Sequence, residues 1–279
     1  MKSAAIIFSG GALRGVAQFG ALEAIEIFMK RKNIVVKAVA GSSFGSISAS
    51  FLSLGYTASE MVHIARKTGF KLFSLRDINL FGSSVLKGKK ITSAFEKYFA
   101  EKTFKDANCE LFINAVDLHS GKELVFTKRG IECLRTPKLL VKRNFKITDA
   151  LLASTAIPAI LKPKKIDDFE FLDGALVSPV GLGLIDYSKY DYVFVIDVSM
   201  ANLTFVSKNS NLKRMDIIGQ AISIVQRELY EHKLKNLLPH KKNVFFIRPN
   251  IKPVRKRSKE ELETLISAGF QEAKKVLKL

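Results

Sequence analysis

The chain contains very little cysteine and histidine. Among its 279 residues there are two cysteines, Cys109 and Cys133, and four histidines. Two cysteines are too few for a disulfide framework, and they lack the paired spacing of a zinc site. We therefore expect structural thiols in a reducing compartment, and we predict neither a metal ion nor another cofactor.

Long apolar runs are also missing. No run of about 18 apolar residues is present, so no membrane-spanning helix is predicted. The apolar start at residues 4–8 breaks at Ser9, short of the roughly 7–15 residues in the core of a secretory signal. We expect a cytoplasmic protein. Because no repeat or linker divides the chain, we predict one domain over residues 1–279, with its motifs within about 4–200 and a C-terminal strand and helices at 211–279 packed on that core.

Acidic residues are scarce: 26 Asp and Glu stand against 45 Lys and Arg, which gives a net charge of +19. Such a charge favours polyanionic partners, but neither zinc-finger spacing nor an aromatic RNA-binding pattern is present. Basic residues near anionic lipid each contribute about 1 kcal/mol of attraction. We therefore expect peripheral contact with the inner membrane surface and no specific nucleic acid, although the clusters at 162–165 and 255–259 can equally be solvated faces. The oligomeric state is left open.

A Gly-x-Ser-x-Gly sequence occupies residues 41–45, with Ser43 at its centre. The apolar run at 34–39 predicts a buried strand before it, and the pattern at 47–54 predicts a helix after it. A serine at such a turn is exposed at its tip and faces the positive end of the helix dipole, which favours a nucleophile. The alternative is a flexible loop, but strand, turn and helix follow in the order that a nucleophile requires.

A second glycine-rich turn, residues 9–15, follows a predicted strand at 4–8 and precedes a helical pattern at about 16–31. Such a turn aims successive N–H groups into one concavity and binds anions. Its glycine spacing fits neither a dinucleotide fingerprint nor a P-loop. The remaining candidate is an oxyanion hole. A right-handed strand–helix–strand crossover brings this turn and the Ser43 turn to one edge of a parallel sheet.

The rest of the chain alternates between helical and strand patterns. We expect a helix at 57–66, a segment without clear period at 68–88 and a helix at 91–100. The segment is either ordinary core or an apolar segment that covers an acyl chain or touches a bilayer. The remaining expected elements are a hairpin at 110–128, a helix at 147–157, strands at 169–173, 192–198 and 244–247, a helix at 211–238 and a final helix from 258.

Asp173 ends the predicted strand at 169–173 and is followed by Gly174 and Ala175. An Asp-Gly sequence after a strand is common as plain turn chemistry. On its own it gives little reason to assign the aspartate a catalytic role.

Four motifs taken together resemble the patatin-like phospholipase family. They lie at residues 9–15, 41–45, 153–158 and 173–175, and their order and spacing match the family over residues 4 to about 200. The resemblance implies an α/β protein of the patatin type, with three α/β/α layers and a central, mainly parallel sheet. It also implies lipid acyl hydrolysis by a Ser–Asp dyad.

The resemblance assigns roles residue by residue. It implies that Ser43 is the nucleophile and Asp173 its base. The amides of Gly10, Gly11 and Ala12 would form the oxyanion hole. The supporting residues would be Arg14, Gly41, Gly45 and Gly174. Arg14 would steady the glycine-rich loop or attract an anionic headgroup.

One departure concerns Ala12, where the family commonly has a third glycine. If the Ala12 amide is needed in a left-handed conformation, alanine is costly there. The histidines give an independent check on the dyad. His63 and His232 fall in helical patterns and His119 in a hairpin turn, which leaves His240, whose lysine neighbours would oppose an imidazolium. A dyad is therefore favoured over a triad.

The residues and the resemblance together predict a serine lipid acyl hydrolase of the phospholipase A or lysophospholipase type, acting through an acyl-enzyme. The alternative is a lipid-surface binding protein with a weak or inactive hydrolase site, suggested by Ala12 and the charge. A nucleic-acid binder is suggested by the isoelectric point alone.

Overall fold

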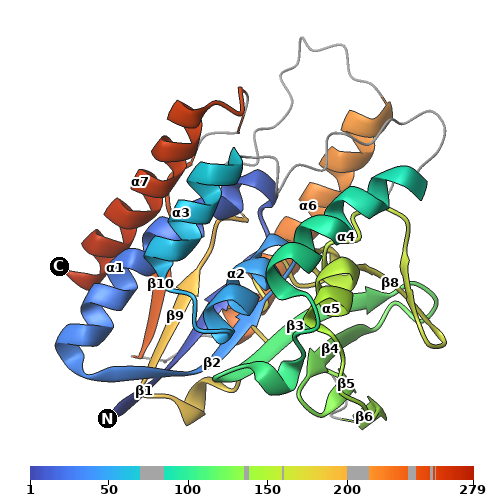
Figure 1. Cartoon of the computed structure of the whole chain (residues 1–279), viewed down its shortest axis with the longest axis horizontal. Coiled ribbons are helices and arrows are strands. Elements are labelled where there is room, and N and C mark those ends of the chain that lie inside the picture. The colour runs from blue at the N-terminus through green and yellow to red at the C-terminus, as the bar shows by residue number, and fades with distance from the viewer. Residues whose placement is uncertain are drawn as a thin grey trace.

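The structure is a computed structural model that describes residues 1–69, 85–134, 138–158, 160–199, 214–237, 243–251, 254 and 256–279. Ten strands form one sheet, in the order β10-β9-β1-β2-β3-β4-β5-β6, with β8 paired to β3 and β7 paired to β8 (Figure 1). The proposed cover at 68–88 and the loop around His240 lie largely or wholly outside the described residues.

The first half of the sheet is parallel. Its strands are β10 (Val244–Ile247), β9 (Tyr192–Ile196), β1 (Lys2–Phe8), β2 (Ile34–Gly41) and β3 (Glu110–Asp117). Phe8 pairs with Gly41 across β1 and β2. The two glycine-rich turns therefore leave the sheet side by side at its carboxyl edge, and the predicted meeting of the turns is confirmed.

The other half is antiparallel. It comprises β4 (Glu123–Thr127), β5 (Gly130–Cys133), β6 (Lys138–Val141), β7 (Lys164–Ile166) and β8 (Phe169–Asp173). The predicted hairpin is the β3–β4 pair, but β5, β6 and β7 are short and were not predicted. β8 runs antiparallel to β3 and pairs Asp173 with Ala115. This reversed direction brings the end of β8 back toward the middle of the sheet.

Most helices cover one face of the sheet. They are α1 (Ala17–Lys32), α2 (Phe44–Ser53), α3 (Ala58–Thr68), α4 (Val85–Phe99), α5 (Ile147–Ser154) and α7 (Lys259–Leu277). The opposite face is covered by the segment 180–190 and by α6 (Arg214–Leu237), drawn in orange in Figure 1. The protein has the three-layer architecture that was expected, and its second outer layer contains one long helix.

The sheet separates two apolar cores, and β1 contributes to both. Ile6 and Phe8 face the helices α1, α2 and α7, whereas Ala5 and Ile7 face the segment 180–190. Alternate side chains of a strand point to opposite faces, so a strand buried on both faces is apolar throughout. This explains the continuous apolar run that marked the strand in the sequence.

Two helix starts differ from the patterns. α2 begins at Phe44, directly after Ser43, three residues before the apolar pattern starts. The glycine-rich turn continues into a short 3-10 helix at Ala12–Val16 before α1 begins. Apolar periodicity detects the buried face of a helix, whereas the first turn is set by backbone geometry. No helix within the described part of the chain has the length and apolar character needed to cross a membrane.

Candidate active site

Ser43 occupies the turn between β2 and α2 in a strained backbone conformation, with φ 51° and ψ −125°. Such a conformation costs a residue with a side chain about 1–3 kcal/mol in free energy. The turn is tight enough that a Cβ on Gly41 would lie 2.2 Å from the carbonyl oxygen of Gly45. Gly41 therefore leaves no room for a side chain, and Gly45 has an equal restriction because its Cβ would lie 2.2 Å from the Phe8 carbonyl oxygen.

Neighbouring hydroxyl groups hold the turn in place. The Ser43 amide donates to Oγ of Ser154 on α5 over 3.0 Å. The Ser46 hydroxyl donates to the Ser43 carbonyl over 2.6 Å. Ser154 belongs to one of the four sequence motifs, but no role was predicted for it. Its contact joins α5, more than 100 residues away in the chain, to the serine turn.

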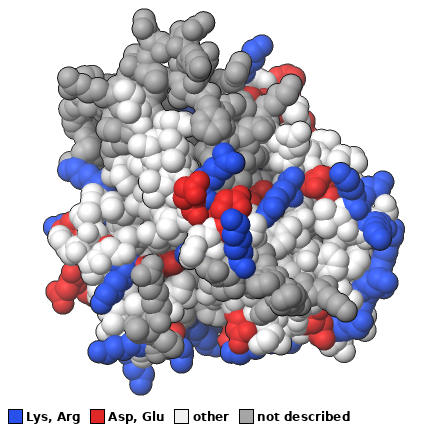
Figure 2. All heavy atoms as spheres, turned by 180° about the vertical axis from the view of Figure 1, so that it is seen from behind, with Lys and Arg blue, Asp and Glu red and all other residues white. Residues whose placement is uncertain are grey.

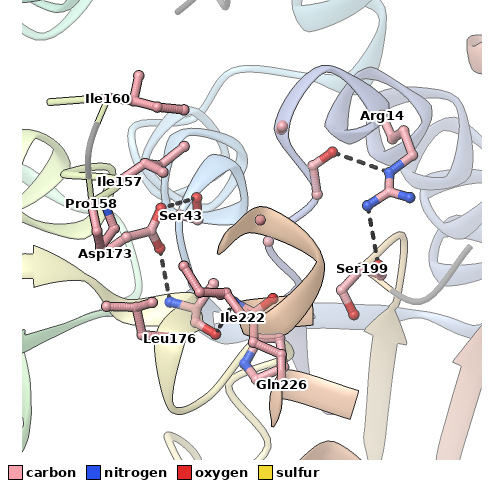
Figure 3. Close-up of a pocket in the computed structure, with 16 residues that line it drawn as sticks. Arg14, Ser43, Ile157, Pro158, Ile160, Asp173, Leu176, Ser199, Ile222 and Gln226 are labelled. Carbon is pink, nitrogen blue, oxygen red and sulfur yellow. Dashed lines mark hydrogen bonds between the residues drawn. The ribbon is translucent and has the colours of Figure 1, made fainter. Parts of the chain in front are cut away.

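The Ser43 hydroxyl donates a hydrogen bond to Oδ2 of Asp173 over 2.7 Å (Figure 3). The other carboxylate oxygen, Oδ1, accepts from the Ala175 amide over 2.8 Å. Asp173 is 4% exposed. Burial raises the pKa of Asp173 to about 7, against the lowering effect of the two hydrogen bonds. The carboxylate is therefore a much stronger base than an exposed aspartate.

Asn114 on β3 supports the turn after Asp173. Its Nδ2 group donates to the Gly174 carbonyl over 3.3 Å and to Oε1 of Glu123 over 2.9 Å. A Cβ on Gly174 would lie 2.3 Å from Oδ1 of Asn114, so this position requires glycine. Asn114 was not predicted. The only signal in the sequence is a polar residue in an otherwise apolar strand.

The glycine-rich loop differs from the prediction in one donor. The Gly10 amide donates to the Pro179 carbonyl over 2.7 Å, so it is already engaged. Within the described part of the chain, the amides of Gly11 and Ala12 donate to no other residue. Ala12 has φ 47°, the left-handed conformation that favours glycine. Of the three predicted donors, two are therefore free to bind an anion.

Arg14 braces this loop and lies apart from Ser43. Its Nε group donates to the Gly11 carbonyl over 3.3 Å, and Nη2 donates to the Ser199 carbonyl over 3.1 Å. In Figure 3 the guanidinium points toward Ser199 and away from the Ser43–Asp173 pair. Burial lowers the pKa of Arg14 below its usual value, with nearby Asp197 acting in the opposite direction. Of the two predicted uses, the contacts favour steadying the loop.

A cavity of about 280 Å³ opens beside Ser43. One wall is apolar, and Figure 3 shows Ile157, Pro158 and Ile160 above the serine with Leu176 and Ile222 below it. The helix α6 contributes three residues, Gly219, Ile222 and Gln226. The remaining lining residues are Gly10, Gly11, Ala12, Arg14, Asp173, Ala175, Pro179 and Ser199.

The described histidines lie away from the cavity. His63 and His232 are exposed on α3 and α6. His119 Nε2 lies 4.0 Å from Oε2 of Glu170, beyond the end of β3. None of the three is among the cavity-lining residues. His240 lies outside the described residues.

The fold and the site define an α/β protein with a serine–aspartate pair at the carboxyl edge of its sheet. A family model described as patatin-like phospholipase matches residues 6–185. The match covers more than half of the chain, and the protein belongs to this family. Membership supports a lipid ester hydrolase.

Individual relatives agree with this assignment. The chain is 24% identical over 242 residues to a cGAMP-activated phospholipase of Vibrio cholerae, covering 76% of this chain and 67% of that protein. It is 27% identical over 226 residues to a cGAMP-activated phospholipase of Escherichia coli, covering 73% of this chain and 62% of the relative. The crystal structure of VipD from Legionella pneumophila shares the fold, with a TM-score of 0.53 at 13% identity, covering 99% of this chain and 66% of VipD.

Proposed function

We propose that the protein is a serine lipid acyl hydrolase in which Ser43 is the nucleophile and Asp173 its base. The observation that carries this proposal is the 2.7 Å hydrogen bond from the Ser43 hydroxyl to Oδ2 of Asp173. The pair borders a cavity that also exposes the free amides of the glycine-rich loop and an apolar wall. Nucleophile, base, anion-binding groups and a surface for a hydrocarbon chain thus meet at one place.

The proposed cycle begins when Asp173 accepts the Ser43 proton as Oγ attacks the ester carbonyl. The raised pKa of about 7 makes Asp173 able to hold this proton. The amides of Gly11 and Ala12 stabilise the tetrahedral oxyanion, and a donor of this kind contributes about 3 kcal/mol. Asp173 then protonates the departing alcohol, leaving an acyl-enzyme. Water, deprotonated by Asp173, hydrolyses the acyl-enzyme and restores Ser43.

The apolar wall supports a fatty-acyl ester as the substrate, of the phospholipase A or lysophospholipase type. Ile157, Ile160 and Ile222 offer contacts to hydrocarbon. The relatives named as phospholipases support the same class. The net charge of +19 supports peripheral contact with an anionic lipid surface.

The test compares the wild type with Ser43→Ala and Asp173→Asn on a short-chain aryl ester. We expect both variants to lose at least about a thousandfold in kcat/KM while keeping the wild-type circular dichroism spectrum. Ser42→Ala is the matched control, because the buried Ser42 hydroxyl has no hydrogen-bond partner among the residues that the structure describes. It should retain activity. Full activity in either dyad variant would overturn the assignment.

A lipid-surface binding protein with a weak site is the second candidate, favoured by the left-handed Ala12 in the glycine-rich loop. Labelling with a fluorophosphonate probe separates the two. A reactive hydrolase is labelled in the wild type and not in Ser43→Ala. An unlabelled wild type that still binds anionic vesicles would establish the second function instead.

A further inference from the structure

Helix α6 turns three polar side chains toward the rest of the protein. Gln226 donates to the Ala175 carbonyl over 2.7 Å, next to Asp173. One turn further, Tyr230 donates to Oδ2 of the buried Asp197 over 2.8 Å.

Lys233 continues this row by pairing with Oε2 of Glu123 over 3.2 Å. The spacings of four and three residues place Gln226, Tyr230 and Lys233 on one face of the helix. That face is bonded to Ala175, Asp197 and Glu123, so the rotation of α6 about its axis is fixed.

The outward side of the first half of the same helix exposes apolar side chains. Ile217 is 53% exposed, Ile224 48% and Val225 56%. We call these three residues the α6 surface. Residues 217–226 contain no charged side chain. A surface helix usually buries its apolar side and exposes its polar side. The first half of α6 departs from this pattern, and a cluster of exposed apolar side chains of this kind marks an interaction surface.

The α6 surface lies beside the cavity. Gly219 and Ile222, from the same two turns of the helix, line the cavity that contains Ser43. In the view from behind (Figure 2), uncharged side chains form an area in the upper left, and both acidic and basic side chains lie along its border. A partner seated on this surface would therefore be next to the mouth of the active site.

We propose that the α6 surface docks on an anionic lipid bilayer with the mouth of the cavity facing it, an inference that rests on the proposed function. The charge supports this partner over another protein. A net charge of +19 attracts the chain to an anionic surface. Arg227 and Glu228 are both exposed at the end of the uncharged stretch and offset each other in charge, so the attraction comes from the net charge of the chain while the apolar residues enter the acyl boundary.

The basic cluster at 162–165 is less suited to this contact. Lys164 is paired with Asp149 over 2.7 Å, and Lys165 is paired with Glu170 over the same distance. Their charges are partly neutralised by these neighbours. The attraction is therefore a property of the whole chain, whereas the orientation on the bilayer comes from α6.

The experiment measures binding without catalysis. Ser43→Ala protein is sedimented with vesicles of equal parts phosphatidylglycerol and phosphatidylcholine, alone and combined with Ile224→Glu. Removing one isoleucine from the apolar contact is expected to weaken partitioning by about tenfold or more. The matched control is Ile27→Glu, an isoleucine 40% exposed on α1. It adds the same charge and should change partitioning by less than about twofold.

Hydrolysis provides the second measurement, made with Ser43 intact. Ile224 does not line the cavity. We therefore expect Ile224→Glu to keep wild-type activity on a soluble aryl ester while losing activity on the same vesicles. A wild type inactive on both substrates would contradict the proposed function and leave the sedimentation result standing. Equal partitioning of the Ile224→Glu and Ile27→Glu proteins would overturn the docking proposal. So would a dimer in light scattering that Ile224→Glu dissociates without changing vesicle binding.

Discussion

Two turns at the carboxyl edge of the sheet hold a non-glycine residue in a left-handed conformation, Ser43 at φ 51° and Ala12 at φ 47°. Their surroundings differ. The Ser43 turn is confined by backbone contacts at Gly41 and Gly45, and the serine hydroxyl is bonded to Asp173. The Ala12 methyl group makes no such bond. The strained conformation at Ser43 positions a side chain. The strained conformation at Ala12 positions a backbone N–H group, which every residue except proline carries.

The largest effect is expected on the stability of the fold, at Gly45 in the Ser43 turn. In Gly45→Ala the new Cβ would lie 2.2 Å from the Phe8 carbonyl oxygen, and a backbone atom cannot move aside cheaply. We expect a loss of about 3 kcal/mol or more in the free energy of unfolding, measured by urea denaturation. The same substitution at Gly219, whose Cβ would meet nothing within 4 Å, should instead gain up to about 1 kcal/mol. Equal stability of the two variants would contradict the packing explanation.

The next largest effect is on the pH dependence of activity, and it concerns Asp173, which accepts a hydrogen bond from Ser43. With the pKa of Asp173 raised to about 7, the base is protonated and inactive in acid. The kcat/KM for a soluble ester should fall about tenfold per pH unit below this pKa and level off above it. A rate that stays constant between pH 5 and pH 8 would show that Asp173 does not titrate as the burial of its carboxyl group implies.

Asp173→Asn should stabilise the fold while removing activity. The aspartate pKa is raised from 3.8 to about 7, so the folded state holds its proton more tightly than the unfolded chain. Wild-type stability therefore falls as the pH rises from about 4 to about 7, whereas a neutral asparagine pays no such cost. We expect the variant to gain on the order of 2 kcal/mol at pH 8 and much less at pH 4.5. A gain independent of pH would refute this account.

The smallest effect on stability is expected at Ala12 in the glycine-rich turn. Ala12→Gly relieves a left-handed alanine but adds freedom to the unfolded chain, for a net gain of about 0.5 kcal/mol. Ester hydrolysis should be equal or higher, since the amide that we propose binds the oxyanion is retained. Ala17→Gly is the control, because Ala17 has a helical φ of −63° and should lose about 1 kcal/mol. A large loss of stability in Ala12→Gly would show that the methyl group is needed after all.

Much of the fold could be predicted from local patterns. The apolar runs located the parallel strands and the glycine-rich turns between them, because a strand buried on both faces has a distinctive composition. The short strands β5, β6 and β7 were missed, since three or four residues carry too little periodicity. Asn114 and Ser154 were missed as site residues because their contacts join segments 60 and 111 residues apart.

By itself the sequence determined the strand–turn–helix order around Ser43, because this order depends on neighbours within a few residues. Only the tertiary structure decided that the Gly10 amide donates to the Pro179 carbonyl, that burial raises the pKa of Asp173, and that α6 exposes Ile217, Ile224 and Val225. Hydrogen-bond partners, burial and the orientation of a helix are set by distant segments that meet only in the folded chain.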